Sequence, residues 1–106
     1  MGILTLKEEM ILSALTLLSG SSRGAPIRKT VSELSKKSIV YGTLYNLLEN
    51  CIRKGYVTAG KSDPEPVQGG RSKTIYTITA EGKEALEETL AMHEQLQKRI
   101  RLESRG

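Results

Sequence analysis

The sequence has one cysteine and one histidine, Cys51 and His93, and neither tryptophan nor phenylalanine. One cysteine cannot form a disulfide within the chain, and together with a single histidine it cannot supply the ligands of a structural zinc site. We therefore expect no metal and no other cofactor. The near absence of cysteine fits a protein of the reducing cytoplasm.

Long apolar runs are also missing. The most apolar stretch, residues 10–18, is interrupted by Ser13 and Thr16 and is too short to span a bilayer. Charged residues at 7–9 precede this stretch and include two acids, so the N-terminus does not resemble a signal peptide. The sequence predicts a cytoplasmic protein without a membrane partner.

Length and charge set the next bounds. With 106 residues, of which 38% are hydrophobic, the chain can build one compact core, so we expect a single domain over residues 1–106. The formal net charge of +4 would favour approach to a polyanion. Ordinary surface lysines would give the same total, so the positions of the cations must decide between these interpretations.

The first helix is marked by its start. Thr5 and Glu8 have the spacing of a capping box, and the apolar residues that follow predict a helix over residues 6–19. Gly20 ends this helix, and residues 20–24 read as a loop.

Two more helices follow. Pro26 fits the first position of a second helix, which should end near Lys36. The third helix closes at Gly55. Its buried stripe consists of Leu44, Leu47, Leu48, Cys51 and Ile52.

The opposite face of the third helix carries the hydrogen-bonding side chains Thr43, Asn46, Asn50 and Arg53. Residues three or four apart lie together on a helix, so we expect these four to face outward as a group. Such side chains read base edges or brace nucleic acid. A merely solvated face would show the same pattern.

After Gly55 the period of the pattern changes to two. Residues 56–59 and 74–79 are rich in β-branched and aromatic side chains, which predicts the two strands of a hairpin. The connection at 62–72 contains proline and glycine and is too long for a tight turn, so we expect a projecting, mobile tip. Arg71 and Lys73 lie at its return edge.

Thr79 is the predicted N-cap of a last helix, which extends beyond the core of the domain. The small domain is complete before Leu96, so an apolar stripe on the far half of this helix needs a partner surface. The same helix of a second chain would supply one, as in a short coiled coil. We predict a homodimer whose interface includes Leu86, Leu90, His93, Leu96 and Ile100.

Together the elements predict a mostly α fold with a β-hairpin wing. It consists of a winged helix-turn-helix over about 5–79, whose third helix enters the DNA major groove, and a C-terminal dimerisation helix over about 80–103. Four blocks sharpen this prediction: Gly-Thr-Leu-Tyr-Asn-Leu-Leu-Glu at 42–49, Lys-Gly-Tyr-Val at 54–57, Gly-Gly-Arg at 69–71 and Tyr-Thr-Ile-Thr-Ala-Glu-Gly at 76–82. In this order and spacing they resemble the PadR family of transcriptional regulators.

The resemblance implies a homodimeric bacterial or phage regulator, usually a repressor, that binds double-stranded DNA at an inverted-repeat operator. Members of the family sometimes respond to small phenolic or hydrophobic compounds. With one helix after the wing, the chain resembles the smaller subfamily, whose dimer interface is built from the first and last helices. Val40 stands where the family commonly has a small or polar residue, and the absence of Trp and Phe argues against an aromatic stacking pocket between subunits.

Within this frame the candidate DNA contacts are Lys36, Lys37, Ser38, Tyr41, Thr43, Tyr45, Asn46, Asn50, Arg71 and Lys73. The lysines of the turn would meet phosphates, although they could also simply solubilise it. The tyrosine rings could instead pack on the domain, and Tyr45 is expected to be the more exposed. Arg71 could instead hold backbone carbonyls of the wing.

Two single residues have ordinary interpretations. Cys51 lies on a buried stripe, which favours a structural thiol over a redox sensor. The position of His93 in the predicted dimer stripe favours a packing role at the interface, although a symmetric pair of histidines near a two-fold axis could bind metal weakly. His93 is also the only possible base for a serine or threonine nucleophile and lies on the wrong helix, so we expect no enzyme. The alternative to a DNA-binding regulator is a winged-helix module that binds protein. Acidic residues at the turn and the wing would indicate such a module, but this chain has basic residues there.

Overall fold

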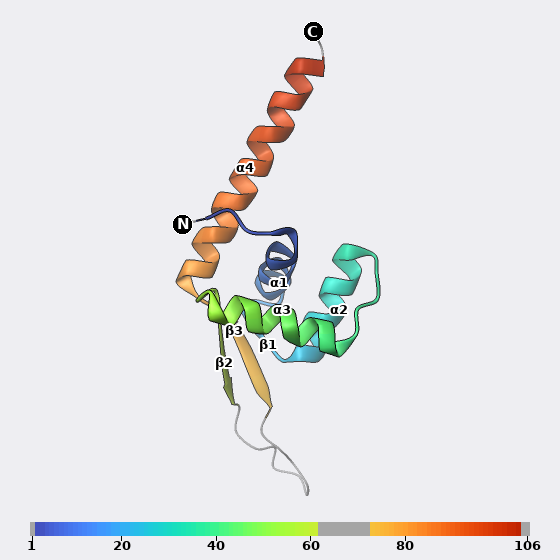
Figure 1. The fold of residues 1–106 in the computed structure, drawn as a ribbon, viewed down its shortest axis with the longest axis vertical. Helices are drawn as coiled ribbons and strands as arrows, with labels where there is room; N and C mark the ends of the chain where they lie inside the picture. Colours follow the sequence, from blue (N-terminus) through green and yellow to red (C-terminus); the bar gives the residue numbers. More distant parts are fainter. Residues whose placement is uncertain (1, 62–72, 105–106) are drawn as a thin grey trace, which may run out of the picture.

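The structure is a computed structural model that describes residues 2–61 and 73–104 (Figure 1). Its elements are α1 (Leu6–Leu17), β1 (Ser21–Ser22), α2 (Gly24–Ser35), α3 (Tyr41–Arg53), β2 (Val57–Lys61), β3 (Thr74–Ile78) and α4 (Ala80–Ser104). Helices α1 to α3 and the start of α4 form the body. The rest of α4 projects from one side and the hairpin from the other (Figure 1). The predicted fold class is confirmed.

The start of α1 follows the capping-box prediction. The Thr5 side chain accepts a hydrogen bond from the Glu8 N–H, and the Glu8 side chain accepts one from the Thr5 N–H. The helix ends at Leu17, two residues before its predicted end. Ser19 and Gly20 then adopt positive φ angles of 69° and 96°, which turn the chain toward the sheet.

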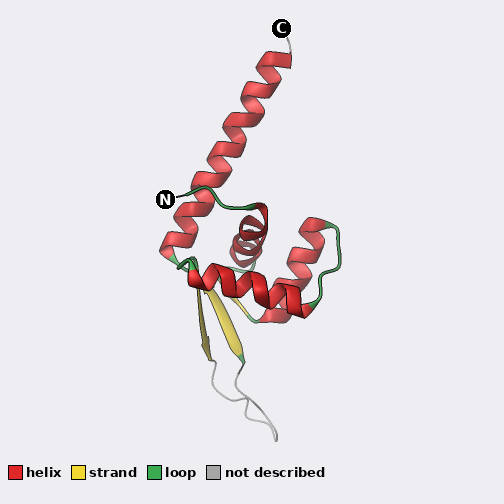
Figure 2. Ribbon diagram, in the orientation of Figure 1, coloured by secondary structure: helices red, strands yellow, loops and turns green. Residues whose placement is uncertain are grey.

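The sheet has three antiparallel strands in the order β1-β3-β2 (Figure 2). The hairpin β2–β3 was predicted, and its register pairs Val57 with Ile78. Strand β1 corrects the prediction of a loop over 20–24. Ser21 pairs with Thr77 and Ser22 with Tyr76, because the turn after α1 delivers this short segment to the open edge of β3.

The second helix begins at Gly24, two residues before its predicted start. Pro26 is its third residue, where the missing N–H still costs no helical hydrogen bond. The helix ends at Ser35, close to the prediction, and Lys36 follows in the left-handed conformation with φ of 57°.

The core is centred on α1. Ile11, Leu12 and Leu15 are fully buried. They cluster with buried residues of every other helix and of both hairpin strands: Ile27, Val31, Leu44, Leu48, Cys51, Val57, Ile78, Ala85 and Leu86. None of the helices in the described part of the chain is long and apolar enough to cross a membrane.

Candidate nucleic-acid interface

The outward face of α3 is polar and open. Thr43, Asn46 and Arg53 are exposed, while Leu44, Leu48 and Cys51 bury the opposite side. Gly42 lies one turn before Asn46 on the same face, and Glu49 is also exposed on it. This face can present amide, hydroxyl and carboxylate groups to base edges. Glu49 was missed in the sequence interpretation, although its helical spacing from Asn46 and Arg53 would have placed it on this face.

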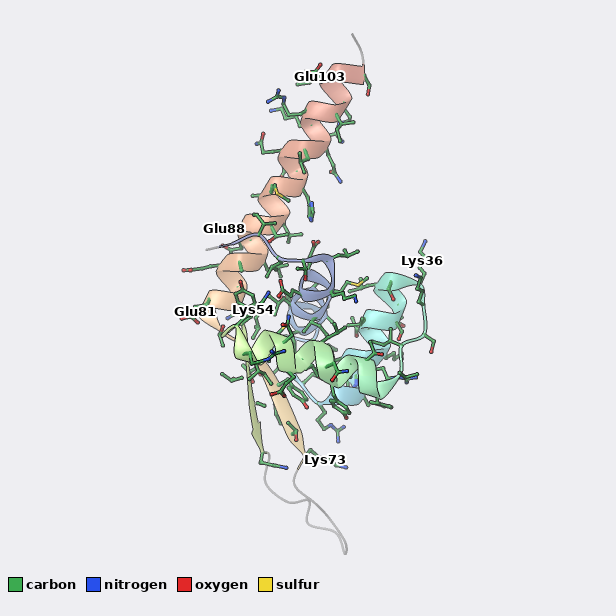
Figure 3. The ribbon with its side chains drawn as sticks, in the orientation of Figure 1. Lys36, Lys54, Lys73, Glu81, Glu88 and Glu103 are labelled. Atoms are coloured by element: carbon green, nitrogen blue, oxygen red, sulfur yellow. The ribbon has the colours of Figure 1, made fainter. Side chains whose placement is uncertain are left out.

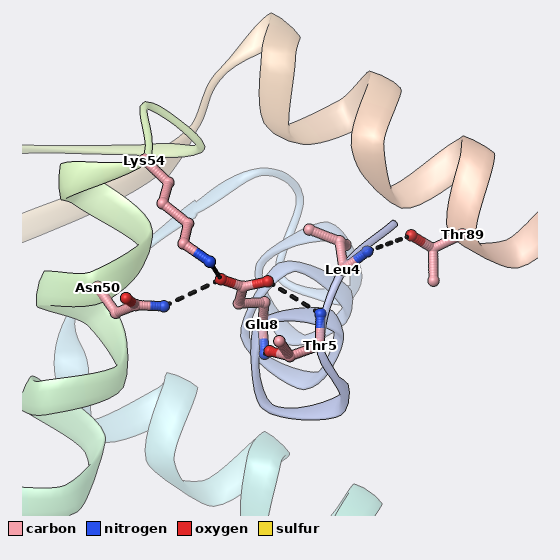
Figure 4. A network of polar contacts seen from close by, with 6 residues as sticks. All are labelled: Leu4, Thr5, Glu8, Asn50, Lys54 and Thr89. Carbon is pink, nitrogen blue, oxygen red and sulfur yellow. Dashed lines mark hydrogen bonds and ion pairs between the residues drawn. The ribbon is translucent and has the colours of Figure 1, made fainter. Parts of the chain in front are cut away.

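Asn50 has the spacing of that face, but its side chain is half-buried and engaged within the chain. Its Nδ2 donates a hydrogen bond of 3.0 Å to Oε2 of Glu8 in α1 (Figure 4). Asn50 lies at the edge of the α3 surface that packs on α1, and the buried carboxylate there needs donors. Its amide therefore braces the contact between α1 and α3.

Glu8 is the centre of a polar network. Only 3% of the residue is exposed. Oε1 accepts from the Thr5 N–H at 2.9 Å, and Oε2 accepts from Asn50 and from Nζ of Lys54 (Figure 4). Burial acts to raise the pKa of this carboxyl, but the hydrogen bonds from Lys54, Thr5 and Asn50 outweigh burial and lower it. Glu8 is thus a charged tie between α1 and the end of α3.

The start of α3 is held by an arginine that sequence reasoning missed. Nε of Arg28 donates to the Ile39 carbonyl at 2.6 Å, and its guanidinium carbon lies 4.7 Å from the centre of the Tyr41 ring. Tyr41 in turn stacks on Tyr45, with ring centres 5.9 Å apart. The two tyrosines are 42% and 46% exposed, so neither is clearly the more open one.

The turn and the wing supply cations on two sides of α3. Lys36, Lys37 and Ser38 are all exposed in the turn after α2. Lys73 immediately precedes β3, and Figure 3 shows Lys36 and Lys73 well apart, with α3 between their levels. Arg71 and the predicted hairpin tip lie outside the described residues.

An open groove of about 620 Å³ lies between the starts of α2 and α3 and strand β3. Its lining residues are Arg23, Gly24, Ala25, Tyr41, Tyr45, Lys73, Thr74 and Tyr76. The groove brings two predicted tyrosines next to the predicted lysine of the wing. Sequence analysis missed Arg23 because this residue falls in a predicted loop. Only the fold brings it to this groove.

The comparisons identify the family. Residues 11–88 match the PadR-like family of transcriptional regulators. The chain belongs to this family. A PadR family transcription regulator from hypervirulent Clostridium difficile is 25% identical, with a TM-score of 0.70 over 96% of this chain and 100% of that one. A transcriptional regulator from Thermoplasma acidophilum is also 25% identical, with a TM-score of 0.70 over 90% of this chain and 86% of that one.

The fold is also similar to that of an organohalide-sensing transcriptional regulator in its 2,4-dichlorophenol-bound form. It is 12% identical, with a TM-score of 0.73 over 93% of this chain and 52% of that one. Among curated proteins, none matches this sequence. The PadR-like family consists of DNA-binding regulators and not of enzymes, which agrees with the sequence prediction.

A second surface of this PadR-like chain is apolar. On α4, Leu90 is 47%, Leu96 50% and Ile100 62% exposed. The first helix and the segment before it add further exposed side chains: Ile3, Leu6 and Leu17. We call these six residues the apolar face. Leu86 was predicted to belong to it, but it is only 6% exposed because it packs in the core of its own chain.

His93 lies beside the apolar face and pairs within its own chain. Its Nε2 is 2.8 Å from Oε1 of Glu9, which joins α4 to α1. Cys51 is fully buried, and burial raises the pKa of its thiol to about 12, as expected for a structural cysteine. In the described part of the chain, no three His, Cys, Asp or Glu side chains gather as a metal site.

Proposed function

We propose that this PadR-like regulator is a cytoplasmic homodimeric repressor that binds an inverted-repeat operator, with residues 1–106 as a single domain. The observation that carries the proposal is the open polar face of α3 between the cations of the turn and of the wing. A winged helix-turn-helix uses such a helix in the major groove and the flanking elements on the backbone.

Thr43 and Asn46 are the proposed base-reading residues. Both are exposed on α3, and an asparagine amide can pair with N6 and N7 of adenine in the major groove. Lys36, Lys37, Ser38, Tyr41, Tyr45 and Lys73 are the proposed backbone contacts. Arg71 is added to these proposed contacts on the basis of its position in the sequence alone.

The apolar face supports the homodimer. Leu90, His93, Leu96 and Ile100 follow one another along α4 at spacings of three, three and four residues, which suit contact with a second helix. The three apolar side chains are each about half exposed. Exposed apolar surface of this extent is costly in water, and a second copy would cover it. His93 borders the same surface. The two α3 helices would then meet half-sites about one helical turn apart. An effector of the small phenolic or hydrophobic class to which some family members respond would act by changing this spacing.

The test is a titration of the purified protein with its own upstream DNA and with a scrambled duplex across a salt series. We expect tighter binding to the upstream duplex, and affinity for both duplexes should fall as salt rises. Failure to bind any duplex at low salt would overturn the proposal in favour of a protein-binding module. Equal affinity for both duplexes would overturn sequence-specific recognition alone.

A further inference from the structure

The described residues that line the groove at the starts of α2 and α3 carry charge of one sign. Among its described lining residues, Arg23 and Lys73 are cationic, Tyr41, Tyr45 and Tyr76 bear hydroxyl groups, and none is acidic. Guanidinium, ammonium and phenol groups are all hydrogen-bond donors that suit a phosphate oxygen. We propose that this groove seats one phosphate of the duplex backbone in each half-site, with Arg23 and Tyr45 as contacts.

The position of the groove in the fold supports a backbone phosphate. In a winged helix complex, α3 lies in the major groove of the DNA and the wing reaches toward the adjacent minor groove. The sugar-phosphate strand that separates these two DNA grooves must pass between α3 and the wing. The protein groove lies there, since α3 lines it with Tyr41 and Tyr45, and the wing lines it with Lys73 and with Thr74 at the start of β3.

The Tyr45 ring packs closely against Gly24, the first residue of α2. Gly24 is buried, and a Cβ at that position would lie 3.1 Å from the hydroxyl oxygen and 3.4 Å from a ring carbon of Tyr45. The ring therefore lies directly against the backbone beside Arg23. A glycine at 24 permits this approach, and it brings the phenol next to the backbone that carries Arg23, which also lines the groove.

This inference rests on the proposed DNA binding, and its test separates the two. Arg23→Gln removes one charge per protomer, and Arg101→Gln at the exposed far end of α4 is the matched control. With a salt slope of about −0.9 per phosphate and two contacts per dimer, Arg23→Gln should reduce the slope by about 1.8 and lower affinity at 0.15 M salt roughly thirtyfold. The loss should be equal for matched and scrambled duplexes.

Two further measurements locate the contact. Tyr45→Phe removes only the hydroxyl, so it should weaken binding to both duplexes without changing the salt slope. In a scan of duplexes that each carry one neutral methylphosphonate, one position per half-site should weaken wild type strongly and Arg23→Gln hardly at all. Urea unfolding of each variant shows that the fold is intact.

The outcomes are distinct. A wild-type protein that binds no duplex overturns the proposed function and this inference together. A wild-type protein that binds, with Arg23→Gln indistinguishable from Arg101→Gln in slope and affinity, overturns the inference alone. So does a methylphosphonate scan in which wild type and Arg23→Gln respond alike at every position.

Discussion

Gly42 and Gly82 both lie in helices without a positive φ, yet their surroundings differ completely. A Cβ at Gly42 would have no neighbour within 4 Å. A Cβ at Gly82 would overlap the Tyr56 carbonyl oxygen and lie 2.9 Å from Cγ1 of Ile78. The same substitution, glycine to alanine, should therefore change stability in opposite directions at the two positions.

The magnitudes follow from two competing effects. Alanine is favoured over glycine in a helix by about 1 kcal/mol, which is the expected upper limit of the gain for Gly42→Ala. At Gly82 the overlap is with backbone, and the Tyr56 carbonyl is held by the Thr79 N–H at 2.9 Å. Relieving the overlap must move α4 away from the sheet, so overpacking should exceed the helix gain and leave a net loss of about 2 kcal/mol.

Urea and thermal unfolding test this pair. For a chain of this length, about 2 kcal/mol corresponds to a fall in Tm of roughly 10 °C for Gly82→Ala, while Gly42→Ala should melt at or slightly above the wild type. Wild-type stability in Gly82→Ala would refute the packing argument. Gly42→Ala should nonetheless bind DNA more weakly, because its Cβ would stand on the α3 face that approaches the bases, and unchanged DNA affinity would show that this face stays clear of DNA.

Other substitutions separate reading, dimerisation and electrostatics. Asn46→Ala should reduce the preference for the matched over the scrambled duplex by about 1–3 kcal/mol, and equal losses for both duplexes would contradict base reading. Leu96→Glu should shift sedimentation at micromolar concentration toward monomer with the fold intact, whereas Leu86→Glu should unfold the chain. A Leu96→Glu variant that still sediments as a dimer would show that Leu96 is not part of the interface. Glu8→Gln should cost about 1–2 kcal/mol at neutral pH. Since folding lowers the pKa of Glu8 below 4.5, this difference should persist above that pH and vanish as the pH falls through the lowered value, and a constant difference would argue against a charged tie.

Apolar periodicity and caps predicted most of the fold because they are local signals. The capping box at Thr5 and Glu8 and the Thr79 cap, which accepts from the Gly82 N–H at 3.0 Å, are both present. Strand β1 was not predicted because two serines show no alternation of apolar and polar side chains. They form a strand only because they pair with the edge of β3. Local patterns predict helices well and predict a short edge strand poorly.

The errors at the site come from tertiary contacts. Asn50 has the sequence spacing of a base-reading residue, and only the fold shows that its amide binds Glu8 of α1. Leu86 and Leu90 are four residues apart on one stripe, but the core ends between them. Arg28 binds the Ile39 carbonyl and Arg23 lines a groove with residues of α3 and β3, and no helical pattern encodes either placement.

The same contacts determine how the two functional surfaces are joined. Helix α1 is tied to α3 by Glu8 with Asn50 and Lys54, and it is tied to α4 by the Glu9–His93 pair. The Leu4 N–H, just before α1, also donates to Oγ1 of Thr89 at 3.0 Å (Figure 4). In the proposed dimer, α4 carries the interface and α3 carries the reading face, so α1 holds the angle between them. Because α1 fills the core and cannot shift without opening it, pairing of the two α4 helices should impose the spacing of the two α3 helices on the DNA.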